Sequence, residues 1–338
     1  MKRRDLTALQ GQAWAVLPGL MPTVAALLRG GLEATSTREL RAQFGGRKLA
    51  AAAAPSRAAG IAVVPVTGLM LHRASYFGCS SEQLARLVRQ LAGDPEIGTI
   101  VLDVNCPGGT VAGTQELFDE LLAARASTKL VAVANATMAS AAYWIAAACH
   151  EIVATPSAEA VGSIGVFDVH TDLTGMEKQI GIKTTLIGAG KYKTEGNPFE
   201  PLSDEARAAR QAGVDAAYEL FVKSVAKGRG VSPADVRNGY GEGRAVGAKA
   251  ALALGLVDRI DTLDATLARL AGRRRQGGAS AELEHEPLHA AAAEASSELA
   301  AEASSGADVA GADVAAVDAS AEHELDLRRR RLRLRRSA

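Results

Sequence analysis

The stretch TIVLDVNCPGG, residues 99–109, decides the fold of this 338-residue chain. Its first six residues form an apolar, β-branched run of the kind that is buried in a parallel sheet. Pro107 ends the strand, and Gly108 and Gly109 permit a turn in which backbone amides point outward. Such amides can bind an oxyanion, although the glycine pair alone is a weak signal and favours an ordinary strand-to-helix turn.

Strand-like and helical patterns alternate on both sides of this stretch, from Ile61 to about Asp258. This alternation indicates βαβ units, and therefore an α/β fold with a parallel sheet and outer helices. Apolar runs predict further strands at residues 61–66, 130–134, 152–155, 163–167 and 183–187. Helical spacing predicts helices at residues 81–91, 114–124, 140–148, 172–180, 203–227, 248–254 and 263–270.

The pattern along the whole sequence predicts four segments. We expect an N-terminal helical arm at residues 1–44, a linker at 45–60, a globular domain at 61–272 and a low-complexity tail at 273–338. Residues 276–327 contain twelve acidic residues and no lysine or arginine, whereas residues 328–336 contain seven arginines. Charge blocks of this kind are typical of a disordered interaction tail.

Composition excludes several classes of function. The formal net charge is zero, which gives no reason to expect nucleic-acid binding. Cys79, Cys106 and Cys149 lack CxxC spacing, so we expect no disulfide framework, no metal site and a reducing compartment such as the cytoplasm. The longest apolar run, residues 13–28, contains two prolines and is shorter than the roughly 20 residues that a membrane span needs. No cofactor-binding motif is evident.

A second candidate for chemistry is ANATMASAAYWIAAA, residues 134–148. Ser140 lies where a strand is expected to give way to a helix, and small neighbours would let a substrate backbone approach its hydroxyl. The amide of Ala141 would then lie near an incoming carbonyl, as at a nucleophile elbow. The alternative is an N-cap serine on a buried helix.

A serine nucleophile needs a base. The histidines of the domain, His72, His150 and His170, lack an orienting context. Lys191 and Lys193 lie in the glycine-flanked IGAGKYKTEGNP after a predicted strand, and a lysine shielded from water can act as a neutral base. In VGSIGV, the Ser163 hydroxyl could hold the amine. Solvated loop lysines and a turn serine remain the alternatives.

Four motifs together resemble one family. DVNCPGG, TMASAAYWIAAACHEIVATPSAEAVGSIGV, IGAGKYKTEGNPFEPLS and GRAVGAKAALALGLVDRI occur in the order and spacing of the SppA-type serine peptidases, across about residues 61–261. The resemblance implies a ClpP/crotonase-like fold and a Ser–Lys dyad without a cofactor or metal. Ser140 resembles the nucleophile, Lys193 the base and Ser163 its hydrogen-bond partner. The oxyanion-hole residues would be Gly108, Gly109 and Ala141.

The sequence departs from the family pattern at two places, and at both places the residues present are small. Cys106 replaces the usual serine before Pro-Gly-Gly, and Ala141 and Ala142 replace glycines after the nucleophile. We interpret both as tolerated.

The Trp-containing N-terminal arm and the alanine- and glutamate-rich tail are similar to the phage prohead, or capsid-assembly, protease branch. That branch implies a homo-oligomeric serine endopeptidase that cleaves scaffold, coat or portal proteins inside the prohead, with a dyad that can form between subunits. The alternatives are a non-catalytic capsid scaffold, a bacterial signal-peptide-peptidase-like enzyme that degrades membrane-derived peptides, and an acyl-CoA enzyme on the same fold.

Overall fold

A parallel sheet forms the centre of the fold in the computed structural model. The structure describes residues 13–17, 56–58, 60–73 and 78–276, which all belong to one compact unit. Four neighbouring strands run parallel in the order β7-β6-β4-β3, which confirms the predicted α/β class. Their side chains are buried on both faces, which explains the nearly continuous β-branched runs. The strands are β3 (Ile61–Thr67), β4 (Thr99–Cys106), β6 (Lys129–Ala139) and β7 (Glu151–Ala154).

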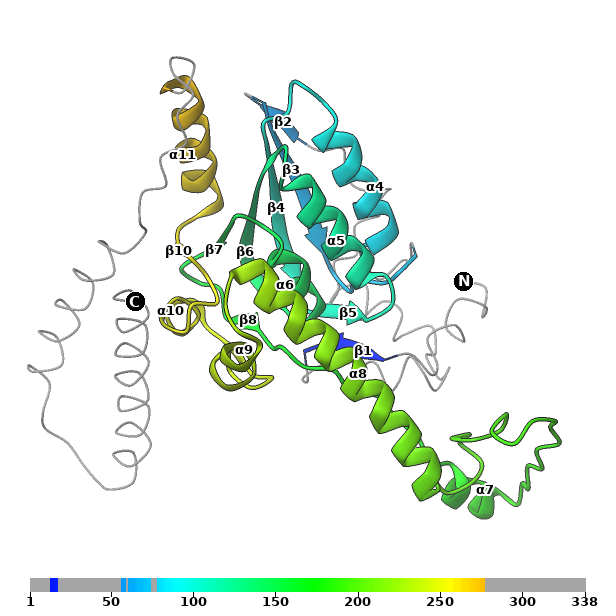
Figure 1. The fold of residues 1–338 in the computed structure, drawn as a ribbon. Coiled ribbons are helices and arrows are strands. Elements are labelled where there is room, and N and C mark those ends of the chain that lie inside the picture. Colours follow the sequence, from blue (N-terminus) through cyan, green and yellow to red (C-terminus); the bar gives the residue numbers. More distant parts are fainter. Residues whose placement is uncertain (1–12, 18–55, 59, 74–77, 277–338) are drawn as a thin grey trace, which may run out of the picture. The chain divides into compact units, whose positions relative to one another are not determined.

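Helices cover both faces of this sheet (Figure 1). On one face, Leu84 and Leu117 from two neighbouring helices pack in the same buried cluster as Leu102 of β4. On the other face, Leu270 packs with Val101, because successive strand residues point to opposite faces. The helices are α4 (Ser81–Ala92) and α5 (Thr114–Ala124) on the first face and α11 (Leu263–Gln276) on the second.

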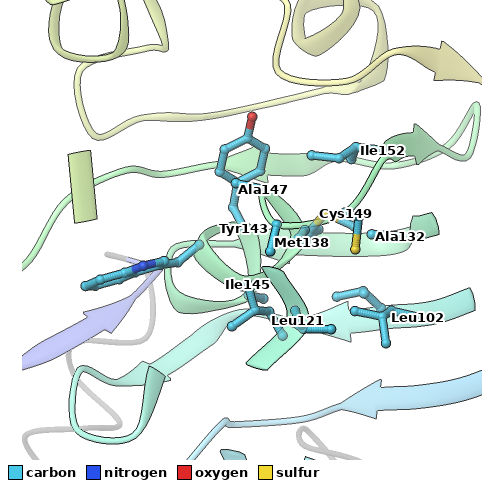
Figure 2. Packing of buried hydrophobic residues seen from close by; sticks show 14 of the residues in the cluster. Leu102, Leu121, Ala132, Met138, Tyr143, Ile145, Ala147, Cys149 and Ile152 are labelled. Atoms are coloured by element: carbon cyan, nitrogen blue, oxygen red, sulfur yellow. The ribbon is translucent and has the colours of Figure 1, made fainter. Parts of the chain in front are cut away.

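A short buried helix, α6 (Ala141–Ala146), lies inside the molecule rather than on its surface. Figure 2 shows Tyr143 and Ile145 of this helix among the side chains of the core, close to Met138 of β6. The Tyr143 hydroxyl donates to the Leu256 carbonyl at 2.9 Å. Trp144 stacks on Phe221 of α8 (Asp204–Arg229), with ring centroids 4.4 Å apart. These contacts hold α6 against α8 and against the segment that contains Leu256.

β6 bends shortly before α6 begins. The register with β4 passes from Val104↔Ala134 to Cys106↔Met138, so β6 carries two more residues than its partner across this interval. Ala136 adopts a φ of 114° within this bulge. Before the bend β6 pairs with β7, and after it β6 pairs with β8 (Ala160–Gly162). The bulge therefore re-aims the end of the strand, and with it the residue that follows.

The C-terminal part of α8 is fixed to the sheet by a half-buried ion pair. Arg229 contacts the Asp258 carboxylate at 2.6 Å and donates to the Gly255 carbonyl at 3.0 Å. The second Asp258 oxygen accepts the Ile152 amide at 2.7 Å. Shorter elements complete this side of the fold, namely α9 (Pro233–Gly239), β9 (Ala245–Val246), α10 (Ala248–Ala253) and β10 (Arg259–Ile260).

Four sequence predictions are wrong where the structure describes the chain. Residues 163–167, expected to form a strand, contain only an isolated β-bridge at Phe167, and the strand in this region is β8, which ends at Gly162. Trp14–Val16, expected in a helical arm, is a strand, β1, because it hydrogen-bonds to two distant backbone segments. Ser56–Ala58, expected in a linker, is a strand, β2, paired with β3. Residues 183–187 form no strand, since this run lies exposed beside no sheet. The other residues of the predicted arm and linker lie outside the described part of the chain.

The C-terminal boundary also differs slightly from the prediction. α11 continues to Gln276, four residues into the segment assigned to the tail, and the tail beyond it lies outside the described residues. Within the described ranges, no helix combines the length and apolar character that crossing a membrane requires.

Candidate active site

Ser140 lies at a sharp junction between a strand and a helix. β6 ends at Ala139 and α6 begins at Ala141, and Ser140 between them has φ 55° and ψ −119°. Such a conformation costs a non-glycine residue about 1–3 kcal/mol and persists only where its surroundings enforce it. Here the Ser140 amide donates to the Gly162 carbonyl at 2.7 Å, and the Ser140 carbonyl accepts the Trp144 amide at 2.9 Å. The sequence prediction of an elbow at Ser140 is therefore met by the backbone.

The Ser140 side chain is enclosed on every side. Its exposed fraction is 0%, and its hydroxyl donates a long hydrogen bond, 3.4 Å, to the Gly165 carbonyl. The alanines around it are also buried and add little bulk. A methyl group placed on Gly108 would come within 3.0 Å of the Ser140 Cβ. The glycine turn and the serine are thus immediate neighbours.

The turn itself requires glycine at both positions. It continues into a short strand, β5 (Gly108–Thr110). Gly108 has a φ of +106°, which favours glycine, and a Cβ on Gly109 would lie 1.6 Å from the Met70 carbonyl oxygen. The Met70 amide donates to Gly108 and the Met70 carbonyl accepts from Thr110, at 2.8 and 2.9 Å.

The structure therefore brings together Gly108, Gly109, Ser140 and Ala141. Ala141 is the first residue of α6, so its amide is among those without an acceptor inside the helix. Backbone amides of a helix start and of a glycine turn, directed at one point, can stabilise the negative charge of a tetrahedral intermediate. The arrangement can support attack by the Ser140 hydroxyl on a carbonyl carbon.

Ser163 lies close to this site but does not contact a lysine. It follows β8, which pairs with the last residues of β6, and it has a φ of 53°. Its amide donates to the Arg244 carbonyl at 2.9 Å, and its hydroxyl donates to the Gly243 carbonyl at 3.2 Å. Within one chain, the hydroxyl thus fixes the loop before β9 rather than an amine.

Lys193 is not brought to Ser140. It lies in an irregular segment between α7 (Thr174–Ile180) and α8, at the end of α8 that points away from the sheet (Figure 1). From here on, the arm means residues 174–203, and not the N-terminal arm predicted at residues 1–44. The Lys193 side chain is exposed, and the neighbouring Lys191 contacts Glu205 at 3.2 Å. The dyad that the family resemblance implies is therefore not assembled within one copy of the chain.

The arm exposes large apolar side chains. Ile187 is 96% exposed, and four further apolar side chains of the arm are more than half exposed. A concentration of apolar side chains on a projecting segment is typical of a protein–protein interface. The other four residues are Met176, Ile180, Ile182 and Tyr192.

Other candidate nucleophiles and bases do not reach the site as reactive groups. A side-chain hydrogen bond from Cys106 and burial together raise the pKa of the Cys79 thiol well above its usual value, so that thiol stays protonated. Burial raises the pKa of the Cys149 thiol to about 12. His150 accepts the Leu130 amide at 3.0 Å, and His170 pairs with the Asn197 carbonyl at 3.1 Å. Among the described residues, no group of acidic, histidine or cysteine side chains is placed to hold a metal ion.

Sequence reasoning missed one element of the site, the strand β1. It lies directly beside Gly108–Thr110, although about ninety residues separate the two segments. The five apolar residues between Gln12 and Pro18 show no periodicity, and only their hydrogen-bond partners make Trp14–Val16 a strand.

Comparison with known proteins agrees with this geometry. The family model of "Peptidase family S49" matches residues 123–276. The chain is 34% identical over 233 residues to the capsid assembly protease C of Escherichia phage lambda, covering 64% of this chain and 52% of that protein. It is 35% identical over 178 residues to the head-tail preconnector protein GP5 of Enterobacteria phage P21, covering 51% and 35%. The chain thus spans between a third and about half of the length of these relatives.

Bacterial and structural relatives complete the comparison. A putative signal peptide peptidase SppA of Enterococcus faecium is 29% identical over 182 residues, covering 52% of each protein. Among solved structures, an enoyl-CoA hydratase from a Polaromonas species superposes with a TM-score of 0.40 at 16% identity, covering 81% of this chain and 90% of that one.

Proposed function

We propose that this chain is a serine endopeptidase with Ser140 as nucleophile, on the premise that residues 123–276 match the model of peptidase family S49. The observation that carries the proposal is the enforced Ser140 elbow beside the Gly108–Gly109 turn. A buried hydroxyl with adjacent outward amides has the two elements that acyl transfer needs most, a positioned nucleophile and a preorganised oxyanion site.

We propose further that Lys193 of a neighbouring copy completes the dyad. The arm projects beyond the sheet at one end of α8 (Figure 1). Lys193 on this arm is exposed, and the arm also exposes apolar side chains that another copy can cover. Enclosure between copies would remove water from the Lys193 amine and favour its neutral, basic form. A homo-oligomer would then be the active species.

The reaction follows from these roles. The neutral Lys193 amine takes the proton of the Ser140 hydroxyl while the oxygen attacks the peptide carbonyl. Amides of Gly109 and Ala141 hold the oxyanion, and the lysine returns the proton to the leaving amine. Water then hydrolyses the acyl-enzyme by the same proton transfers. Ser163 acts through the lysine, as a positioning residue.

Two phage relatives named for head assembly favour a setting for this activity. We propose that the substrates are scaffold, coat or portal polypeptides, cleaved inside a prohead during capsid maturation. The acidic and arginine-rich tail at 273–338 would be the first substrate, because it is joined to the enzyme. A signal-peptide-peptidase-like role rests on the similarity to the putative SppA of Enterococcus faecium.

The test is intact-mass spectrometry of the full chain over time, beside three variants. We expect the wild type and Lys191→Ala to shorten, with cuts after about residue 270, and Ser140→Ala and Lys193→Ala to stay whole. Denatured casein serves as a second substrate. Cleavage that persists in purified Ser140→Ala would refute the nucleophile assignment.

A non-catalytic scaffold is the second candidate, and the exposure of Lys193 on the arm, in contrast to the buried Ser140, favours it. In that case wild type and Ser140→Ala would behave alike in every assay, including the oligomeric state in which the arm is covered.

A further inference from the structure

β1 (Trp14–Val16) runs antiparallel to β5, the strand that leaves the glycine turn. The register pairs Trp14 with Thr110, Ala15 with Gly109 and Val16 with Gly108. The pairing continues on both sides, since the Val111 amide donates to the Ala13 carbonyl at 3.1 Å and the Leu17 amide donates to the Pro107 carbonyl at 2.8 Å. Five consecutive residues, 13–17, therefore run antiparallel alongside residues 107–111, which include the Gly108–Gly109 turn.

The opposite edge of β1 is also hydrogen-bonded. The Trp14 amide donates to the Phe167 carbonyl at 2.9 Å, and the Phe167 amide donates to the Trp14 carbonyl at 3.0 Å. Phe167 belongs to the segment whose Gly165 carbonyl accepts the Ser140 hydroxyl. β1 is thus inserted between the two segments that flank Ser140. An extended peptide bound by strand addition would make these same main-chain hydrogen bonds.

The register places one particular peptide group at the serine. Bonded and non-bonded pairs alternate along antiparallel strands, so the bonded pairs Ala13–Val111 and Leu17–Pro107 make Ala15–Gly109 the bonded pair between them. The Ala15 carbonyl therefore faces the amide of Gly109. A methyl group on Gly108 would come within 2.2 Å of the Ala15 oxygen, 2.9 Å of the Val16 Cα and 3.0 Å of the Ser140 Cβ.

The side chains suit this position. Ala15 is fully buried in the main core cluster, where a larger side chain would have to displace packed neighbours. Trp14, also fully buried, packs with Leu69, Leu71 and Phe167 in a small cluster separate from the main core. Leu69, Leu71 and Phe167 therefore contact an aromatic side chain that lies one residue before the peptide group facing Ser140.

We infer that residues 13–17 are a resident pseudo-substrate, seated in the peptide-binding groove with the Ala15–Val16 peptide at Ser140. The inference rests on the proposed function, since it takes Ser140 as the nucleophile. While β1 is seated, Ser140 is closed to other polypeptides, which accounts for its 0% exposure. The groove would take extended polypeptides with a small residue at the cleaved bond and an aromatic residue before it.

A binding experiment without catalysis tests this directly. In the full-length Ser140→Ala chain, Ala15→Pro removes the amide that pairs with Gly109, whereas Ala15→Ser keeps both the amide and the small size. The probe is a fluorescein-labelled peptide of residues 12–18, QAWAVLP. We expect the Ala15→Pro chain to bind it at least about tenfold more tightly than the Ala15→Ser chain, because its own segment no longer competes.

A second variant guards against misfolding. Trp14→Ala leaves the backbone unchanged and removes the side chain from the cluster with Leu69, Leu71 and Phe167. It should also bind the peptide more tightly than Ala15→Ser, and circular dichroism should show an intact fold. Equal binding by all variants, or none by any folded variant, would overturn the inference.

Catalysis is then measured separately. With Ser140 restored, casein cleavage should be faster in Ala15→Pro and Trp14→Ala than in Ala15→Ser. If the peptide binds as expected but every Ser140 protein is inactive on casein, the groove assignment stands and the peptidase proposal fails. If casein is cleaved equally by all while peptide binding does not differ, the peptidase proposal stands and β1 is only structural.

Discussion

The regions that carry Ser140 and Lys193 differ in how much of their geometry one chain determines. Ser140 is fully buried, with its backbone held by Gly162 and Trp144 and its neighbours packed in the core. Lys193 lies on an arm of irregular, exposed backbone with unpartnered apolar side chains. Under the proposed mechanism, folding of one chain positions Ser140 and the glycine turn, whereas the proposed base Lys193 becomes available only through association of copies.

The strongest test of this contrast compares the two residues in activity and stability. Ser140→Ala and Lys193→Ala should each lower the cleavage rate at least about a thousandfold, since members of one catalytic unit fail together. Lys193→Ala should leave the free energy of unfolding within about 0.5 kcal/mol of wild type, because its side chain is exposed. Rates on casein and urea unfolding check the two statements. A Lys193→Ala protein with wild-type turnover would remove the arm from the mechanism.

A pair of glycine substitutions probes the two regions in the same chemical way. Gly109→Ala would press a methyl group to 1.6 Å from the Met70 carbonyl, so we expect a loss of about 3 kcal/mol of stability and of all activity. Gly175→Ala, in the arm, has no atom within 4 Å of its added methyl and should be neutral or slightly stabilising. Thermal unfolding measures both, and a tolerated Gly109→Ala would show that the turn is not as closely packed as described.

Removing an apolar side chain from the arm should affect association alone. Ile187→Ser should lower the cleavage rate several-fold at low protein concentration while the stability of the single copy changes by less than about 0.5 kcal/mol, because Ile187 touches little in its own chain. Analytical ultracentrifugation and casein cleavage across a dilution series check this. In the wild type, activity should fall faster than linearly on dilution, and strict linearity down to the monomer would contradict a dyad shared between copies.

The smallest expected effect is the pH dependence of stability that Asp103 of β4 causes. Burial raises the pKa of Asp103, against an opposing hydrogen bond from Asn135 at 3.1 Å. A raised folded-state pKa means that the folded protein binds the proton more tightly than the unfolded chain, so stability falls as pH rises through that pKa. Asp103→Asn should therefore be slightly more stable than wild type at pH 7, and the gain should vanish below about pH 4. Urea unfolding at both pH values measures it, and a gain that grows in acid would show the opposite shift.

Sequence alone predicted the elements whose geometry is local. The run at residues 99–104 is a buried strand, and Ser140 lies at the expected strand-to-helix junction. Each of these depends on neighbours within a few positions, so composition and period carry the information.

The missed features depend on partners distant in the chain. β1 is a strand only because it forms backbone hydrogen bonds with Gly108–Thr110 on one edge and with Phe167 on the other. The β-branched run at 183–187 is not a strand, because no sheet edge lies beside it. The Ser163 hydroxyl pairs with Gly243, 80 residues away, and no local pattern specifies that contact.

The most direct test of the central claim mixes two inactive proteins. Ser140→Ala and Lys193→Ala are purified separately, then combined under conditions that allow copies to exchange, and casein cleavage is measured. If the base comes from a neighbouring copy, an equimolar mixture should recover about a quarter of the wild-type rate, because a site works only where an intact Ser140 meets an intact Lys193. A mixture as inactive as its components, with copy exchange demonstrated, would contradict a dyad formed between copies.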